Sequence, residues 1–154
     1  MYKNFNKKIV AIIEARMTSS RLPGKVLMPL AGKPALERLI ERIKRSQYLD
    51  QIVVATTNNQ TDDPVEGLTR RLGVGCFRGS EDDVLGRVLQ AAQSFFADVI
   101  VEITGDCPLA DPRLVDRGIE EFFSHDVDYV SNIIKLSYPN GFDVQVFPTR
   151  VLAE

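Results

Sequence analysis

Three uninterrupted apolar stretches constrain the fold of this chain more than any other feature. They cover residues 9–13, 52–55 and 99–101, and polar residues bound each one. Strands with one wet face alternate apolar and polar residues, whereas strands buried on both faces are apolar throughout. The stretches therefore predict parallel strands, at residues 8–15, 52–56 and 99–104.

Amphipathic segments follow these strands, which predicts that helices connect them. In the first segment, apolar side chains recur at helical spacing, and charged residues of both signs fill the opposite face. Because the signs are mixed, the charged face favours a solvated surface over a nucleic-acid-binding one. The apolar positions are Leu36, Leu39, Ile40 and Ile43.

Side chains that can cap a helix predict where the later helices begin. Asp63 is the expected cap of a second helix, and Gly73 its expected end. Ser80 and Asp83 are expected to form a capping box for a third helix, and Asp111 starts a fourth. Strand and helix thus alternate along most of the chain.

This alternation predicts one domain over residues 1–154. Its class is α/β: a doubly wound, mostly parallel sheet with helices on both faces. Shorter strands are expected at residues 75–78, 127–131 and 143–147. Residues 148–154 resemble a helix that has barely begun, so we expect the domain to be truncated at its C-terminus.

Composition excludes several classes of function. The 154 residues are 44% hydrophobic and 26% charged, with a formal net charge of -2. These values predict an ordinary core and no general attraction to nucleic acid or anionic membranes. No apolar run approaches the ~20 residues that span a bilayer, and two cysteines are too few for a disulfide framework. We expect a cytoplasmic protein with neither nucleic acid nor membrane as a partner.

The loop after the first strand is strongly cationic. Arg16, Arg21 and Lys25 lie within ten residues of one another, at the sheet edge where doubly wound folds bind ligands. Such side chains, with nearby hydroxyls, suit a polyphosphate. The loop matches no P-loop pattern, and the glycines of the chain miss the dinucleotide fingerprint. Taken alone, the loop fits a phosphate site and an ordinary basic surface equally well.

Asp106 favours the phosphate site. It follows the strand at residues 99–104 and a glycine, so its carboxylate is expected at the same sheet edge as the cationic loop. A carboxylate facing cations suits a magnesium ion that bridges to phosphates. The combination predicts a site for Mg²⁺ and a nucleotide.

Four motifs carry a resemblance to a known family. The segment A-R-M-x-S-S-R-L-P-G-K-V-L, which begins at Ala15, resembles the signature loop of the cytidylyltransferases. R-G-S-E-D-D-V-L-x-R from Arg78, T-G-D-C-P-L from Thr104 and N-G-F-D-V from Asn140 are similar to the same family. The motifs look most like its spore-coat polysaccharide biosynthesis type, beside the CMP-deoxyoctulosonate and CMP-sialate synthetases.

The resemblance implies a fold, an activity and roles for residues. The fold would be that of the nucleotide-diphospho-sugar transferases. The enzyme would transfer CMP from CTP to an acidic sugar, release pyrophosphate, require Mg²⁺ and form a homodimer. Arg21 and Lys25 would be catalytic, offsetting charge on the pyrophosphate, and Asp106 would bind the metal. The implied nucleotide-binding residues are Ala15, Arg16, Ser20, Arg21, Lys25 and Arg78, and the implied substrate-binding residues are Arg87 and Asp143.

Some questions stay open at this point. Glu14 stands where the family usually has an uncharged residue, and Gln145 where the spore-coat type usually has Glu, so base preference and sugar are not assigned. Glu14 fits either a general base or a strand-end carboxylate bonded to backbone, and His125 is expected outside the site. The alternatives are a nucleotidyltransferase for another base or a sugar 1-phosphate, and a non-catalytic nucleotide-binding lobe.

Overall fold

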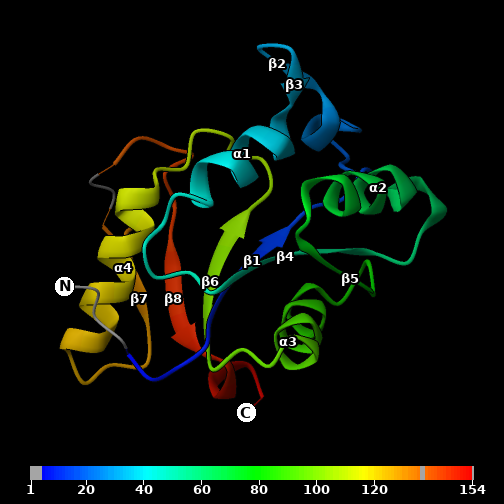
Figure 1. Ribbon diagram of the computed structural model, residues 1–154. Helices are drawn as coiled ribbons and strands as arrows, with labels where there is room; N and C mark the ends of the chain where they lie inside the picture. Colours follow the sequence, from blue (N-terminus) through cyan, green and yellow to red (C-terminus); the bar gives the residue numbers. More distant parts are fainter. Residues whose placement is uncertain (1–4, 136–137, 154) are drawn as a thin grey trace.

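The computed structural model describes residues 5–135 and 138–153, and a six-stranded sheet forms its centre (Figure 1). The strand order is β5-β4-β1-β6-β8-β7. β8 (Gln145–Pro148) is antiparallel to β6, and β7 (Val130–Ser131) is antiparallel to β8. The predicted mostly parallel sheet is confirmed. Its parallel strands are β1 (Ile9–Glu14), β4 (Gln51–Thr57), β5 (Gly75–Gly79) and β6 (Val99–Thr104).

Helices cover both faces of this sheet, but unevenly. α1, α2 and α4 pack on one face, while α3 and the short 3-10 helix η3 (Thr149–Leu152) lie on the other. A small hairpin of β2 (Pro29–Leu30) and β3 (Lys33–Pro34) extends beyond α1 (Figure 1). The helices are α1 (Ala35–Ile43), α2 (Asp63–Leu72), α3 (Val84–Ser94) and α4 (Pro112–Ser124).

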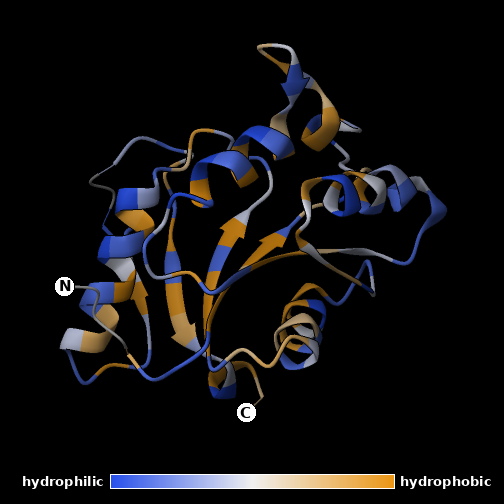
Figure 2. Ribbon diagram, viewed as in Figure 1, coloured by the Kyte–Doolittle hydropathy of each residue, from blue (hydrophilic) through white to orange (hydrophobic). Residues whose placement is uncertain are grey.

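β1 is apolar throughout because both of its faces are buried. Ile9, Ala11 and Ile13 face the cluster that includes α1, whereas Val10 and Ile12 face α3. All five side chains are at most 2% exposed, and burying a side chain of this size stabilises the fold by roughly 1.5–3 kcal/mol. Figure 2 shows that the neighbouring strands β4 and β6 are also mostly hydrophobic. The strand buried on both faces is confirmed.

The row of β1 side chains that faces α3 ends in a carboxylate. Val10 and Ile12 precede Glu14 on that face, and on β6 Ile100 precedes Glu102. Apolar residues thus fill the middle of this face, and acidic residues appear toward the carboxyl ends of the strands. This change of polarity marks the edge at which a ligand can enter.

The start of α2 differs from the prediction. Asp62, rather than Asp63, occupies the N-cap position, and its fully buried carboxylate turns inward. It accepts hydrogen bonds from the backbone N–H groups of Met17 (2.8 Å) and Thr57 (3.0 Å) and from the Thr56 hydroxyl (2.9 Å). Burial opposes the charge, but these bonds outweigh it and lower the pKa of Asp62. Asp62 therefore ties the loop after β1 to the end of β4.

The start of α3 uses both residues of the predicted capping box, and two other predictions hold. Asp83 caps α3, because its Oδ1 accepts from the Gly86 N–H at 2.8 Å; Ser80 accepts from the Asp83 N–H at 3.1 Å. Gly73 ends α2 with a left-handed φ of 64°, and Asp111 caps α4 as predicted.

The C-terminal elements are shorter than predicted. β7 and β8 replace the longer strands expected at residues 127–131 and 143–147, and residues 149–152 form a short 3-10 helix where the start of a helix was expected. Glu154 lies outside the described residues. Within the described part of the chain, no helix is both long and apolar enough to cross a membrane.

Candidate active site

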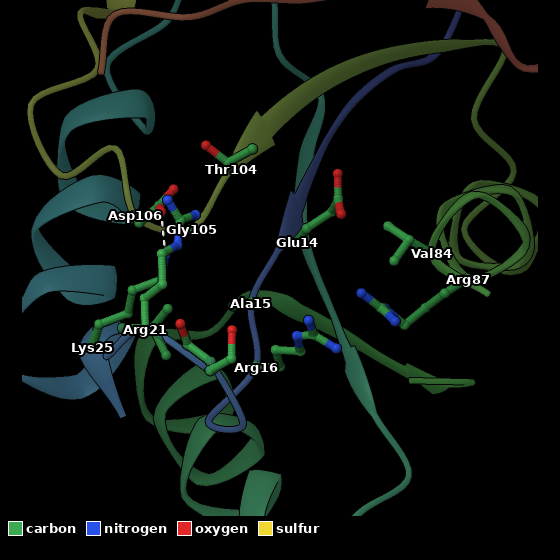
Figure 3. Close-up of a pocket in the computed structure, with 13 residues that line it drawn as sticks. Glu14, Ala15, Arg16, Arg21, Lys25, Val84, Arg87, Thr104, Gly105 and Asp106 are labelled. Atoms are coloured by element: carbon green, nitrogen blue, oxygen red, sulfur yellow. Dashed lines mark hydrogen bonds and ion pairs between the residues drawn. The ribbon is translucent and has the colours of Figure 1, made fainter. Parts of the chain in front are cut away.

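A cavity of about 250 Å³ opens at the carboxyl ends of β1 and β6. The loop after β1 forms one wall, and the N-terminal turn of α3 forms the opposite wall (Figure 3). This is the edge at which doubly wound sheets bind ligands. Its lining residues are Glu14, Ala15, Arg16, Ser19, Ser20, Arg21, Lys25, Val26, Val84, Arg87, Thr104, Gly105 and Asp106.

The cavity gathers most of the residues that the sequence singled out, but not all. Arg78 and Asp143 are not among its lining residues. Thr104 and Gly105 line the cavity but were not predicted as site residues. Both directly precede Asp106 in a quoted motif, and this proximity could have indicated them. Val84 has an apolar side chain that nothing in the sequence linked to the site. The predicted residues that line the cavity are Ala15, Arg16, Ser20, Arg21, Lys25, Arg87 and Asp106.

Lys25 and Asp106 meet across one side of the cavity. The Lys25 ammonium donates to Asp106 Oδ2, and this bond holds the pKa of Asp106 below its ordinary value. Gly24 has a left-handed φ of 72°, which glycine adopts without strain, and it begins the short 3-10 helix η1 (Lys25–Leu27) that presents the lysine. Figure 3 shows Arg21 on the same side, beside this pair.

Arg16 lies on the other side of the loop. Its Nη1 is 3.4 Å from Glu81 Oε1, and Glu81 also accepts from the Thr18 hydroxyl and the Asn59 side-chain amide. The hydrogen bonds from these donors lower the pKa of Glu81, and the bond from Thr18 has the largest effect. Glu81 therefore holds the loop after β1 against the loop after β5, and it offsets part of the Arg16 charge.

Arg78 works as a clamp outside the cavity. Its guanidinium donates to the backbone carbonyls of Thr57 (2.8 Å) and Asn59 (2.6 Å) and pairs with Asp63 (2.7 Å) and Glu66 (2.8 Å). These bonds join β5 to the end of β4 and to α2. They engage the Nε, Nη1 and Nη2 atoms of the guanidinium, so this geometry lends no support to the predicted contact of Arg78 with cytidine. That contact stays a prediction.

Asp143 and His125 also lie away from the cavity wall. Burial raises the pKa of the Cys107 thiol, and the charges of Asp106 and Asp143 raise it further. Asp143 is therefore close enough to Cys107 to act on it, although it does not line the cavity. His125 follows α4, and its Nδ1 is 3.0 Å from the Glu121 carbonyl oxygen. The predicted sugar contact of Asp143 therefore stays a prediction, while His125 lies outside the cavity as expected.

The ends of β1 and β6 approach each other closely at Gly105. The Gly105 N–H donates to the Glu14 carbonyl oxygen at 2.8 Å. A Cβ atom on residue 105 would lie 2.6 Å from that oxygen and 3.0 Å from the Ala15 Cβ. Since no real side chain tolerates such a contact with backbone, only glycine allows the two strand ends to form one floor.

Glu14 and the buried Arg87 line the part of the cavity next to α3, and Glu102 lies beside Glu14 beneath the lining. Burial and the neighbouring carboxylate of Glu14 raise the pKa of Glu102 to about 8. Arg87 is 2% exposed, donates to the Ser80 carbonyl oxygen, and has no partner for its Nε atom within the described residues. Burial lowers the pKa of Arg87, and the charge of Glu14 opposes that change.

Asp106 fits a metal ion that arrives with a nucleotide. No group of three His, Cys, Asp or Glu side chains suitable for a metal exists among residues 5–135 and 138–153. Mg²⁺ at nucleotide sites is usually held by one or two carboxylates together with substrate phosphates and water. A single carboxylate flanked by cations for those phosphates meets this requirement.

Comparisons with known proteins agree with this geometry. A sequence model of the family described as cytidylyltransferase matches residues 10–137. The chain is 41% identical to the spore coat polysaccharide biosynthesis protein SpsF of Bacillus subtilis over 125 residues, which is 79% of this chain and 52% of SpsF. It is 36% identical to the 3-deoxy-manno-octulosonate cytidylyltransferase of Trichlorobacter lovleyi, over 77% of this chain and 46% of that protein.

A solved structure shows the same relationship. The cytidylyltransferase from Leptospira borgpetersenii serovar Hardjo-bovis superposes with a TM-score of 0.92 at 35% identity, over 96% of this chain and 63% of that one. The chain spans about half the length of these two curated relatives. Since the family match covers most of the chain, this protein belongs to the cytidylyltransferase family.

Proposed function

We propose that this chain binds CTP and transfers CMP to an acidic sugar, with release of pyrophosphate. The observation that carries the proposal is the meeting of Lys25 and Asp106 at one side of a cavity whose wall also includes Arg16 and Arg21. Cations on one loop suit the phosphates, and the facing carboxylate suits a metal bound to them. The names of the relatives support CTP as the nucleotide and an acidic sugar as the acceptor.

The chemistry of such a transfer needs positioning and charge stabilisation more than covalent help from protein. A sugar hydroxyl attacks the α-phosphorus in line, and pyrophosphate departs. Arg21 and Lys25 offset the negative charge that grows on the pyrophosphate. Mg²⁺, held by Asp106, would supply further charge neutralisation when bound.

The proposal also includes the setting of the enzyme. We place it in the cytoplasm, as a homodimer that serves surface or spore-coat polysaccharide biosynthesis. The name of the relative SpsF supports the role in polysaccharide biosynthesis. Support for a dimer comes from apolar side chains exposed around the edge strand β7, and light scattering of the purified protein tests it. These side chains are Val127, Tyr129, Ile133 and Ile134.

Pyrophosphate release tests the function directly. The purified protein is incubated with CTP, MgCl₂ and 3-deoxy-manno-octulosonate, and then with N-acetylneuraminate in place of the first sugar. Lys25→Ala and Asp106→Ala should each lower the rate at least ~10²-fold, because each removes charge stabilisation of the transition state. Lys44→Ala is the matched control, because Lys44 bonds to the Leu72 carbonyl oxygen, outside the residues that line the cavity.

Parallel measurements separate the alternatives. Thermal shifts with CTP, UTP, GTP and ATP rank the bases, since a ligand that binds the folded state stabilises it. A sugar 1-phosphate as acceptor tests the other transferase class. CTP binding without pyrophosphate from any acceptor would favour the non-catalytic lobe. Near-normal turnover in both Lys25→Ala and Asp106→Ala would overturn the proposed mechanism.

A further inference from the structure

Glu14 lines the cavity, and Glu102 lies beside it on the same face of the sheet, beneath the lining. β1 and β6 are parallel, with Ile12 opposite Glu102 and Glu14 opposite Thr104. Side chains two positions apart on a strand share a face, so Glu14 and Glu102 are diagonal neighbours on the face that α3 covers. Burial first, and then a hydrogen bond with Glu14 and the charge of that residue, raise the pKa of Glu102, which agrees with this placement. Figure 3 shows the Glu14 carboxylate between Thr104 and α3, well apart from the Lys25–Asp106 pair.

The cavity offers one other carboxylate, and that one is already engaged. Asp106 is paired with Lys25, and the remaining charged side chains of the lining are arginines. Attack by a sugar hydroxyl requires that its proton go to an acceptor within reach. Of the groups that line the cavity, Glu14 is the carboxylate not held by a cation of the phosphate-binding loop.

A buried arginine shows that this part of the cavity is built around charge. Arg87 is 2% exposed and lines the cavity opposite Glu14, and its Nε atom has no partner within the described residues. In Figure 3 its guanidinium points from α3 toward Glu14 and Arg16. An orphaned donor of this kind marks a place where a polar ligand completes the site.

We propose that the Glu14–Glu102 pair takes up the proton of the attacking hydroxyl, with Glu14 in contact with the substrate and Glu102 as a positioning residue. The inference rests on the proposed transfer reaction. The hydroxyl O–H bond breaks and its proton goes to the Glu14 carboxylate. The freed electron pair forms the O–P bond to the α-phosphorus, and the bond from that phosphorus to the bridging oxygen breaks as pyrophosphate leaves.

The pair makes this step dependent on pH. While Glu102 keeps its proton, its O–H donates to Glu14 and occupies an acceptor position that the substrate hydroxyl needs. Since the pKa of Glu102 is about 8, the proton leaves in mildly alkaline solution, and the pair then readily takes up another. Gln145, the β8 residue opposite Glu102, is uncharged. The charged groups of this cluster on the other surrounding elements are Arg16, Asp62, Glu81 and Arg87.

The experiment is a pH profile of pyrophosphate release from CTP, MgCl₂ and 3-deoxy-manno-octulosonate, repeated with N-acetylneuraminate. In the wild type, the rate should rise through about pH 8. Glu14→Gln should lower the rate at least ~10²-fold across the profile, which is the usual contribution of a general base. Glu102→Gln should lose the rise and stay near the rate that the wild type shows at low pH, because the glutamine amide holds no titratable proton and goes on donating to Glu14. Glu121→Gln, on the exposed surface of α4, is the matched control and should follow the wild type.

Titration of the protein with ¹³C-labelled glutamate adds a readout independent of turnover. One carboxyl signal should titrate near pH 8 in the wild type and be absent in Glu102→Gln. An active Glu14→Gln enzyme with an unchanged profile would overturn the inference and leave the proposed function intact. So would the absence of that carboxyl signal. A wild type that releases no pyrophosphate with either sugar would instead overturn the proposed function, and this inference with it.

Discussion

Asp106 and Glu102 are four positions apart, yet the structure drives their ionisation in opposite directions. Asp106 faces the Lys25 ammonium, which lowers its pKa, whereas Glu102 is buried beside Glu14, and its pKa rises to about 8. Both belong to the end of β6 and the loop that follows it. The difference teaches that a partner from a distant part of the chain, rather than residue type or sequence position, decides what a carboxyl group can do here.

The same contrast divides the cavity into two halves. The phosphate half holds Arg21, Lys25 and Asp106, and the acid half holds Glu14 and Arg87, with Glu102 beneath. The first half suits the charge of a triphosphate, and the second suits a proton that leaves a hydroxyl group. If the halves are independent, a substitution in one half should leave ligand binding and titration in the other half unchanged.

The largest effect is expected from Arg21→Ala on CTP binding. Within the described residues Arg21 makes no hydrogen bond or ion pair, so its removal leaves the fold intact. Loss of charge-assisted bonds to phosphate should weaken binding on the order of ten- to a hundredfold, measured by isothermal titration calorimetry. Glu102→Gln should change the affinity less than about threefold, because no phosphate contact is removed. Arg70→Ala, on the exposed side of α2, is the control. Equal losses in Arg21→Ala and Glu102→Gln would show that the halves are one site.

Gly105→Ala should strain the floor that joins the two halves. The new Cβ atom would meet backbone, 2.6 Å from the Glu14 carbonyl oxygen, so the strand ends must move apart. We expect a loss of about 1–3 kcal/mol in the free energy of unfolding, as for other overpacked sites. Chemical denaturation measures it. Gly67→Ala is the matched control, since a Cβ there meets nothing within 4 Å and alanine favours the helix. Equal stability of the two variants would contradict the close approach.

Glu102→Gln should change how stability depends on pH. The folded pKa of Glu102 is about 8, above its ordinary value of 4.5. Its protonated form therefore contributes stability that is complete below about pH 4.5 and is lost as the pH rises through 8. The variant should melt at least about 2 °C above the wild type at pH 9 and close to it at pH 4.5. A constant difference across this range would mean that the pair does not titrate as proposed.

Asp106 has the opposite sign, since its pKa is lowered. Its contribution to stability is present above its ordinary pKa of 3.8 and is lost as the pH falls through the folded value. In Asp106→Asn, the melting temperature should therefore fall less between neutral and acid pH than it does in the wild type. Its dependence on pH on the alkaline side should be unchanged. Differential scanning calorimetry from pH 2 to 9 measures both limbs, and a change confined to the alkaline limb would contradict the Lys25 pairing.

The smallest effect is expected from Lys25→Met on stability. The Lys25 and Asp106 side chains are 27% and 44% exposed, so water and salt screen their attraction. Such pairs contribute about 0–1 kcal/mol, and urea denaturation at low and high salt should show a difference that shrinks with salt. A loss of several kcal/mol would mean that Lys25 supports the fold rather than the ligand.

Sequence patterns were sufficient to predict a mostly parallel sheet, but they did not predict its strand order or every local contact. Uninterrupted apolar runs such as residues 9–13 predicted strands buried on both faces, because only such strands exclude polar residues from both sides. The N-cap position of α2 is Asp62 rather than the predicted Asp63. The Asp62 carboxylate bonds to Met17, Thr56 and Thr57 instead of capping its own helix, and these tertiary partners cannot be read from the local sequence.

The phosphate half of the site was visible in the sequence because its residues are close in the chain or directly follow a strand. Arg21 and Lys25 share one loop, and Asp106 follows β6. The acid half was visible only in part, because the sequence drew attention to Glu14 and the resemblance implied Arg87, but neither pointed to Glu102. Glu102 lies inside a strand that reads as apolar, 88 positions from Glu14, and nothing local marks it.

The sequence by itself therefore determined the layered fold, the family and the cationic loop, since each follows from residues close together along the chain. Only the tertiary structure decided that Arg78 clamps β5 to its neighbours instead of lining the cavity, and that Glu14 meets Glu102. The physical reason is that pairing and proton affinity depend on distance and burial in space, which the order of residues does not specify.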